Sequence, residues 1–145
     1  MSVLMTGGAA LHLATRLRVV GVAAVLFGIL TILSGGLVHF GGAEARSAAG
    51  AIVSFVLWFN FTAGFFYVLA GAGLFLHRRW AAVLSAVIAA ATLFVFLAFG
   101  LHVLTGGDFE FRTVGAMIFR SAVWISIAAY VWRRLYMRAE SDLSP

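Results

Sequence analysis

Hydrophobic and polar positions alternate along this chain on the scale of whole helices rather than of single residues. Four long runs are uncharged or nearly so, and they cover residues 19–40, 51–76, 81–104 and 113–132. Each has at least about 20 residues, which at a rise of about 1.5 Å crosses roughly 30 Å of hydrocarbon. Because none shows the period-two alternation of a barrel strand, the pattern predicts four membrane-spanning α-helices.

The composition excludes a soluble helical bundle. Apolar residues make up 63% of the 145 residues and charged residues 10%, against roughly 45–50% and 25% in ordinary globular chains. The runs are apolar on all sides rather than along one stripe, so in water they would expose a patch that soluble monomers avoid. The sequence therefore predicts an all-α integral membrane four-helix bundle, a single domain over residues 1–145 in contact with the lipid bilayer.

The arginines predict the orientation of the bundle. All ten basic residues are arginines, and seven of them flank the runs on one side: Arg16, Arg18, Arg78, Arg79, Arg133, Arg134 and Arg138. By the positive-inside rule this side is cytoplasmic, together with both termini and a short tail over residues 133–145. The layout predicts a multi-pass protein of a bacterial-type inner membrane. Because topology accounts for the basic residues, we exclude nucleic-acid binding.

The first run has an alternative interpretation as a signal peptide, since Ala43-Glu44-Ala45 has the form of a cleavage site. A run over residues 19–40 is longer than the apolar core of about 7–15 residues in such peptides. We therefore interpret it as a retained span.

Glycines predict which helices pack closely. Glycines recur every seven residues in and just after the first run, at Gly21, Gly28, Gly35 and Gly42. The second run has two glycines at the same spacing, Gly64 and Gly71. Small residues at this spacing share one helix face and let two backbones approach in lipid. We expect close contact between the first and second spans, although a chain with 16 glycines also produces some such spacings by chance. The short turn at residues 77–79 predicts an antiparallel hairpin of the second and third spans.

Arg120 is the polar residue that topology does not explain. It follows Arg112 by eight positions, which places its Cα about 12 Å deeper along the fourth span. An ionised Arg at that depth costs a few kcal/mol or more unless it is paired or extends to the headgroups. Two interpretations remain open at this point: a snorkelling or structurally paired side chain, and a group that binds a ligand or ion.

Three further polar residues fall on inward faces: His39 and His102 lie in the same outer half of the bundle, and Asn60 lies nearer the midplane. With Arg120 they provide one polar side chain from each span, and we expect the four to border one ligand-binding cavity. Asp108 and Glu110 are expected at its mouth, where they also suit the first turn of the fourth helix.

Several occupants fit such a cavity. Two imidazoles on separate helices can ligate a b-type haem, with Arg120 on a propionate, and a quinone-like ligand needs only an apolar slot with a few donors. His39, His102 and a carboxylate of Asp108 or Glu110 are chemically suitable for a metal ion. The sequence nevertheless favours a non-catalytic accessory or scaffold subunit, whose helices bind protein partners or further copies of the chain. The alternative is a redox-associated binder of quinone or haem b.

Three common catalytic motifs do not occur in this chain. The sequence has no G-x-x-x-x-G-K, G-x-S-x-G or H-E-x-x-H pattern, and no Cys for thiol chemistry.

The first half of the chain resembles the DoxX-like small membrane proteins in three segments: Arg16-Leu17-Arg18, Gly35-Gly36 and Ala70-Gly71-Ala72-Gly73-Leu74. The resemblance implies four spans and an association with respiratory or thiol redox systems, and it carries over no functional residue. The absence of Cys argues against direct thiol chemistry here.

Overall fold

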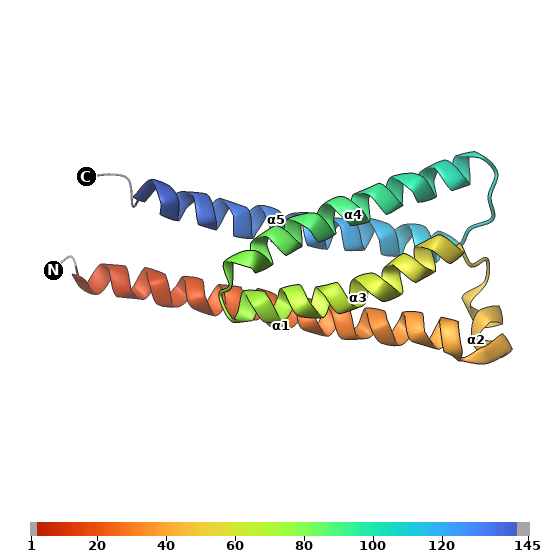
Figure 1. Ribbon diagram of the computed structural model, residues 1–145, viewed down its shortest axis with the longest axis horizontal. Coiled ribbons are helices and arrows are strands. Elements are labelled where there is room, and N and C mark those ends of the chain that lie inside the picture. The colour runs from red at the N-terminus through yellow and green to blue at the C-terminus, as the bar shows by residue number, and fades with distance from the viewer. Residues whose placement is uncertain (1–2, 142–145) are drawn as a thin grey trace.

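The computed structural model describes the backbone of residues 3–141 and the side chains of residues 14–134. Within these residues it contains helices and no strand. The five helices are α1 (Val3–Phe40), α2 (Gly42–Ala49), α3 (Ser54–Phe75), α4 (Arg79–Leu104) and α5 (Phe111–Ser141). Figure 1 shows the first turns of α1 and the last turns of α5 at one end of the bundle and α2 at the other, which we call the α2 end.

Four of these helices are long and apolar enough to cross a membrane. The qualifying segments are Ala14–Phe40, Ser54–Phe75, Arg79–Leu104 and Phe111–Arg134. The prediction of an all-α bundle with four membrane-spanning helices is confirmed. The first and last helices extend beyond the predicted ranges 19–40 and 113–132, and α5 continues through most of the predicted tail. Hydropathy marks where a helix leaves the apolar layer, whereas the helix itself continues until its backbone hydrogen bonding is interrupted. Proline is the residue that interrupts it most strongly, and the chain has only one.

The glycine repeat brings α1 and α3 together, as predicted. A Cβ atom on Gly21 would lie 2.7 Å from the carbonyl oxygen of Gly71, and one on Gly28 would lie 2.8 Å from that of Gly64. Real side chains do not tolerate such distances, so these positions need glycine for the backbones to meet. Gly42 has a different role, because its φ of +80° lets the chain turn between α1 and α2.

The connections at the two ends of α4 are short and hydrogen bonded. After α3, the amide of Arg78 donates to the carbonyl of Gly73 and that of His77 to Leu74, which is the pattern of a Schellman motif. His77 takes the left-handed conformation there, with φ of 56°. The predicted antiparallel hairpin of α3 and α4 is therefore present. The same motif closes α4, with Gly106 at φ of +85°.

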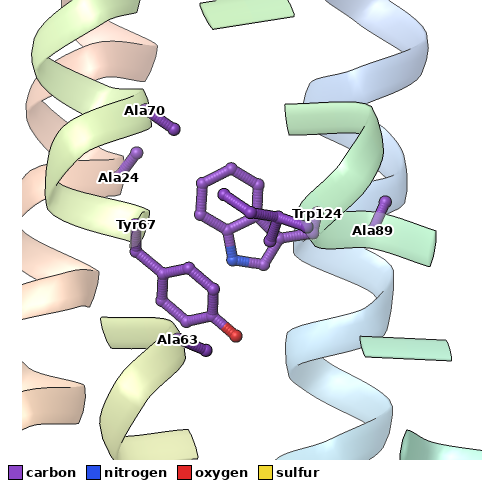
Figure 2. Close-up of a cluster of buried hydrophobic side chains, with 7 residues drawn as sticks. Ala24, Ala63, Tyr67, Ala70, Ala89 and Trp124 are labelled. Atoms are coloured by element: carbon purple, nitrogen blue, oxygen red, sulfur yellow. The ribbon is translucent and has the colours of Figure 1, made fainter. Parts of the chain in front are cut away.

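The centre of the bundle is a cluster of two large aromatic side chains and several alanines. Tyr67 of α3 and Trp124 of α5 are fully buried, with ring centroids 4.7 Å apart. Figure 2 shows the two rings side by side, surrounded by Ala24, Ala63, Ala70 and Ala89. The small neighbours leave room for two rings between helices that are otherwise closely packed.

The helices pack in a chain-like order. Extended packing joins α1 to α3, α3 to α4 and α4 to α5, while α1 and α5 meet through individual side chains. Phe27 of α1 and Phe119 of α5 are in edge-to-face contact, with centroids 5.8 Å apart. We call this fourth side of the bundle the α1–α5 seam, and the candidate site lies along it.

Candidate functional site

A cavity of about 500 Å³ lies near the α2 end, between α1, α3 and α5 and beneath α2. This volume falls in the usual range for small-molecule sites. Most of its wall is apolar or small, and the polar side chains that line it are Thr31, Ser34, Asn60, Arg112, Thr113 and Arg120. A smaller hollow of about 160 Å³ adjoins it and shares Asn60, Arg112 and Thr113.

Arg120 enters the bundle from α5 and sits against aromatic rings. Its side chain is only 8% exposed. The guanidinium carbon lies 5.9 Å from the ring centroid of Phe27 and 5.9 Å from that of Tyr67, and these two rings stack at 5.6 Å. Arg120 therefore does not run along the lipid surface towards the headgroups, so the snorkelling form of the first interpretation does not apply.

Two of the three side-chain nitrogens of Arg120 make no hydrogen bond to the described residues. Its Nε and Nη1 atoms are buried and have no partner among the described residues. The sequence also has no Asp or Glu inside any of the four membrane-spanning segments. Each aromatic contact is worth roughly 0.5–2 kcal/mol, but each buried unpaired N–H costs about 1–3 kcal/mol, and more when the group is charged. The rings hold the guanidinium in place without supplying the acceptors that it requires.

Asn60 of α3 is the second lining residue with unused capacity. Its side chain is half-buried, borders both hollows, and has a buried Oδ1 with no hydrogen-bond partner among the described residues. The hydroxyls on α1 differ in this respect. Thr31 donates to the carbonyl of Phe27 at 2.8 Å, and Ser34 donates to the carbonyl of Thr31 at 3.2 Å.

Arg112 and Glu110 fasten α2 over the cavity. Arg112 Nη2 donates to the carbonyls of Ala48 and Ala49, at 3.4 and 3.2 Å. These carbonyls end α2, so the cation meets the negative end of that helix. Glu110 Oε1 accepts a hydrogen bond from the amide of Ala51 at 3.1 Å. Glu110, expected at the cavity mouth, therefore holds the connection after α2 and does not line the cavity.

The two histidines lie outside the cavity. The ring of His39 packs against Trp58, with centroids 4.1 Å apart. His102 Nε2 donates to the carbonyl oxygen of Asp108 at 3.3 Å, and its ring contacts Phe55. The side chain of Asp108 is exposed and also lies outside the cavity lining.

These positions do not suit a shared haem or metal. The ring contacts of His39 and His102 have no residue in common, and neither imidazole lines the hollow that Asn60 and Arg120 share. Within residues 14–134, no group of three or more His, Asp or Glu side chains is placed to hold a metal ion. Of the four residues expected around one cavity, the structure brings together Asn60 and Arg120.

Sequence reasoning did not identify Phe27 and Tyr67 as part of the site. The available signal was their spacing, because Tyr67 follows Asn60 by seven positions and Phe27 precedes Thr31 by four. Both spacings place two residues on one helix face. The contribution of Arg112 was also missed, since its position at a helix end was fully explained by topology.

Protein-family profiles, curated proteins and solved structures contain no match for this chain. The chemistry of the cavity is therefore the basis on which a function is assigned.

Proposed function

We propose that this protein binds an amphipathic, lipid-like ligand in the cavity at the α2 end, with the polar head of the ligand at Arg120 and Asn60. The observation that carries the proposal is Arg120, which is 8% exposed, has two buried nitrogens with no partner among the described residues, and lines a cavity of about 500 Å³. Retaining such a group unpaired is costly in lipid. A ligand with hydrogen-bond acceptors offsets that cost.

The position of the cavity supports a ligand that arrives from the bilayer. It lies along the α1–α5 seam, the side of the bundle that extended helix packing does not close. Leu37, Val38, Leu57 and Ala116 form apolar parts of the wall. These walls suit an apolar tail, while the polar head reaches Arg120. Small-molecule sites usually combine a largely apolar lining with a few polar groups that orient the ligand.

The proposal includes an orientation in the membrane. The end of the bundle opposite α2 carries six arginines with described side chains: Arg16, Arg18, Arg78, Arg79, Arg133 and Arg134. At the α2 end, Arg46 and Arg112 are offset by Glu44, Asp108 and Glu110. By the positive-inside rule, both chain ends are cytoplasmic in a bacterial-type inner membrane. The cavity then belongs to the outer leaflet.

The ligands and roles considered from the sequence differ in how well they fit the residues of this cavity. A quinone carbonyl is an acceptor, so a quinone-like ligand remains within the proposed class. Haem b is not proposed, because His39 and His102 lie outside the cavity. A scaffold role with protein partners, and a relation to DoxX-like proteins, stay predictions on which no feature of the site bears.

The test is a comparison of two tryptophan substitutions on α5. Ala116 lines the cavity, whereas Ala122 is exposed on the same helix and lies outside it. Each variant is purified in a neutral detergent, and the co-purified lipids and quinones are extracted and quantified by mass spectrometry. We expect a stoichiometric amphiphile in the wild type and in Ala122→Trp, and its loss in Ala116→Trp. Equal amounts in both variants, or none in the wild type, would contradict the proposal.

A further inference from the structure

We infer that the head of the ligand is an oxyanion, a carboxylate or a phosphate ester on an alkyl chain, and that it serves as the countercharge of Arg120. This inference rests on the proposed function, because it specifies the head group of the same amphipathic ligand. It draws on charge balance, on donor geometry and on the surroundings of the guanidinium.

Charge balance is the first argument. None of the four membrane-spanning segments contains Asp or Glu. Of the acidic side chains within residues 14–134, Glu44 and Asp108 are exposed at the α2 end, and Glu110 accepts the amide of Ala51. The described protein thus offers Arg120 aromatic faces and no carboxylate. A buried cation of this kind is normally paired, so the countercharge is expected to come from the ligand.

Donor geometry is the second argument. A guanidinium presents its N–H groups in pairs that match two oxygens of a carboxylate or phosphate. In Arg120, Nε and Nη1 belong to the two different pairs of the guanidinium, and both are buried without a partner among the described residues. The side-chain amide of Asn60, which borders the same cavity, adds donors for a further oxygen and an acceptor for a protonated one. A neutral alcohol or single carbonyl would leave part of this set unused.

The electrostatic surroundings agree with an anion. The described residues that line the cavity include two arginines and no Asp or Glu. Arg112 is engaged by the carbonyls of Ala48 and Ala49 at the outer end, so Arg120 remains as the cation available to a ligand. The apolar walls favour an oxyanion that carries an alkyl chain over a free inorganic ion. A fatty acid and a phospholipid share this chemistry.

The wild-type protein itself provides the primary test. The protein is reconstituted in nanodiscs of a lipid with no net charge at about pH 8, where a free carboxyl group is ionised. Binding of radiolabelled dodecanoate, dodecyl phosphate and dodecanol is measured, with inorganic phosphate as a competitor. We expect both anionic amphiphiles to bind roughly 10-fold or more tightly than dodecanol, as the usual strength of charge-assisted hydrogen bonds implies.

The outcomes of this comparison distinguish a failure of the inference from a failure of the proposed function. Equal binding of dodecanol and dodecanoate would overturn the anionic head and leave the amphipathic cavity intact. Binding of neither would overturn both. Displacement of dodecanoate by inorganic phosphate would identify a free-anion site and overturn the requirement for an alkyl chain. Preference for dodecyl phosphate over dodecanoate points to a phospholipid, and the reverse points to a fatty acid.

Variants of Arg120 then test whether the anionic head group binds at this residue. In Arg120→Gln the preference for the anionic amphiphiles is expected to disappear, while Arg79→Gln, an exposed arginine at the opposite end of the bundle, keeps it. Arg120→Lys retains the charge without the paired donors, and an intermediate preference is expected. An unchanged preference in Arg120→Gln would show that the anion binds elsewhere. If that variant does not fold, Arg120→Lys and the wild-type comparison still decide the question.

Discussion

At the residue scale, the unusual feature is a buried guanidinium held by two rings instead of a carboxylate. Phe27 and Tyr67 come from α1 and α3, whereas Arg120 comes from α5. The three side chains therefore join helices that do not all pack extensively on one another. Cation–π contacts of this kind are worth more when water is excluded. They orient the cation and leave the hydrogen-bonding capacity of its buried Nε and Nη1 unused by the described residues.

Tyr67→Phe tests whether the ring or the hydroxyl matters. Tyr67 is 0% exposed and its hydroxyl has no hydrogen-bond partner among the described residues. Because an unpaired buried hydroxyl is unfavourable, its removal is expected to leave stability unchanged or raise it by up to about 1 kcal/mol. Tyr67→Leu, which also removes the ring, is expected to lower stability by about 2 kcal/mol or more. The measurement is an SDS titration of the fraction of folded protein.

The opposite result for Tyr67→Phe would be informative. A loss of about 1 kcal/mol would reveal a hydrogen bond from the hydroxyl. The buried hydroxyl of Thr92, which also has no partner assigned among the described residues, is the partner to test next. The double variant with Thr92→Val would then lose no more than the single one.

At the element scale, the α1–α3 interface depends on the absence of side chains. Gly28→Ala would place a methyl group 2.8 Å from the carbonyl oxygen of Gly64, which belongs to the backbone and cannot turn aside. We expect a loss of about 1–3 kcal/mol from separating the helices. Gly115 on α5 has nothing within 4 Å of an added Cβ, so Gly115→Ala is the matched control. The SDS titration applies here too, and equal stability of both variants would contradict this account of the interface.

The end of α4 gives a second glycine prediction with a different physical cause. Gly106 has φ of +85°, a conformation that an added Cβ strains, although no atom lies within 4 Å of it. Gly106→Ala is expected to cost about 1 kcal/mol through backbone strain. Gly100→Ala, earlier in α4 and also in open space, is expected to be neutral or to gain up to about 1 kcal/mol. Thermal unfolding of the two variants compares them, and the same sign for both would refute the distinction.

The elements that sequence predicted are those with a direct physical signature. Long apolar runs predicted the four spans, and glycines seven residues apart predicted the α1–α3 contact. The short helix α2 was not predicted, because eight residues of small and charged side chains have no apolar run. The rotation of each helix was also harder to predict than its extent. His39 shares a face with Gly35 by its spacing, yet its ring packs against Trp58. The α1 residues that line the cavity are Thr31, Ser34, Gly35, Leu37 and Val38.

At the scale of the whole molecule, the α2 end and the opposite end of the bundle both carry exposed residues, so the proposed membrane orientation can be measured directly. The chain has no Cys, so single cysteines can be introduced into an unmodified background. Ser47 lies in α2 and Leu76 at the opposite end of the bundle, and both are exposed. In intact cells an impermeant maleimide is expected to label Ser47→Cys, and to label Leu76→Cys only after the membrane is permeabilised. The reverse pattern would invert the orientation and place the cavity in the inner leaflet.

The buried position of Arg120 also has a consequence for the biosynthesis of the protein. An Arg near the centre of a helix costs roughly 2.5–3.5 kcal/mol when the helix inserts into a bilayer through the translocon. The rings that face Arg120 belong to α1 and α3, which leave the ribosome before α5. If the earlier helices are already assembled, α5 can enter beside aromatic surfaces instead of bare lipid. The order of the helices in the chain thus lets the helix that carries the buried arginine arrive when its partners are in place.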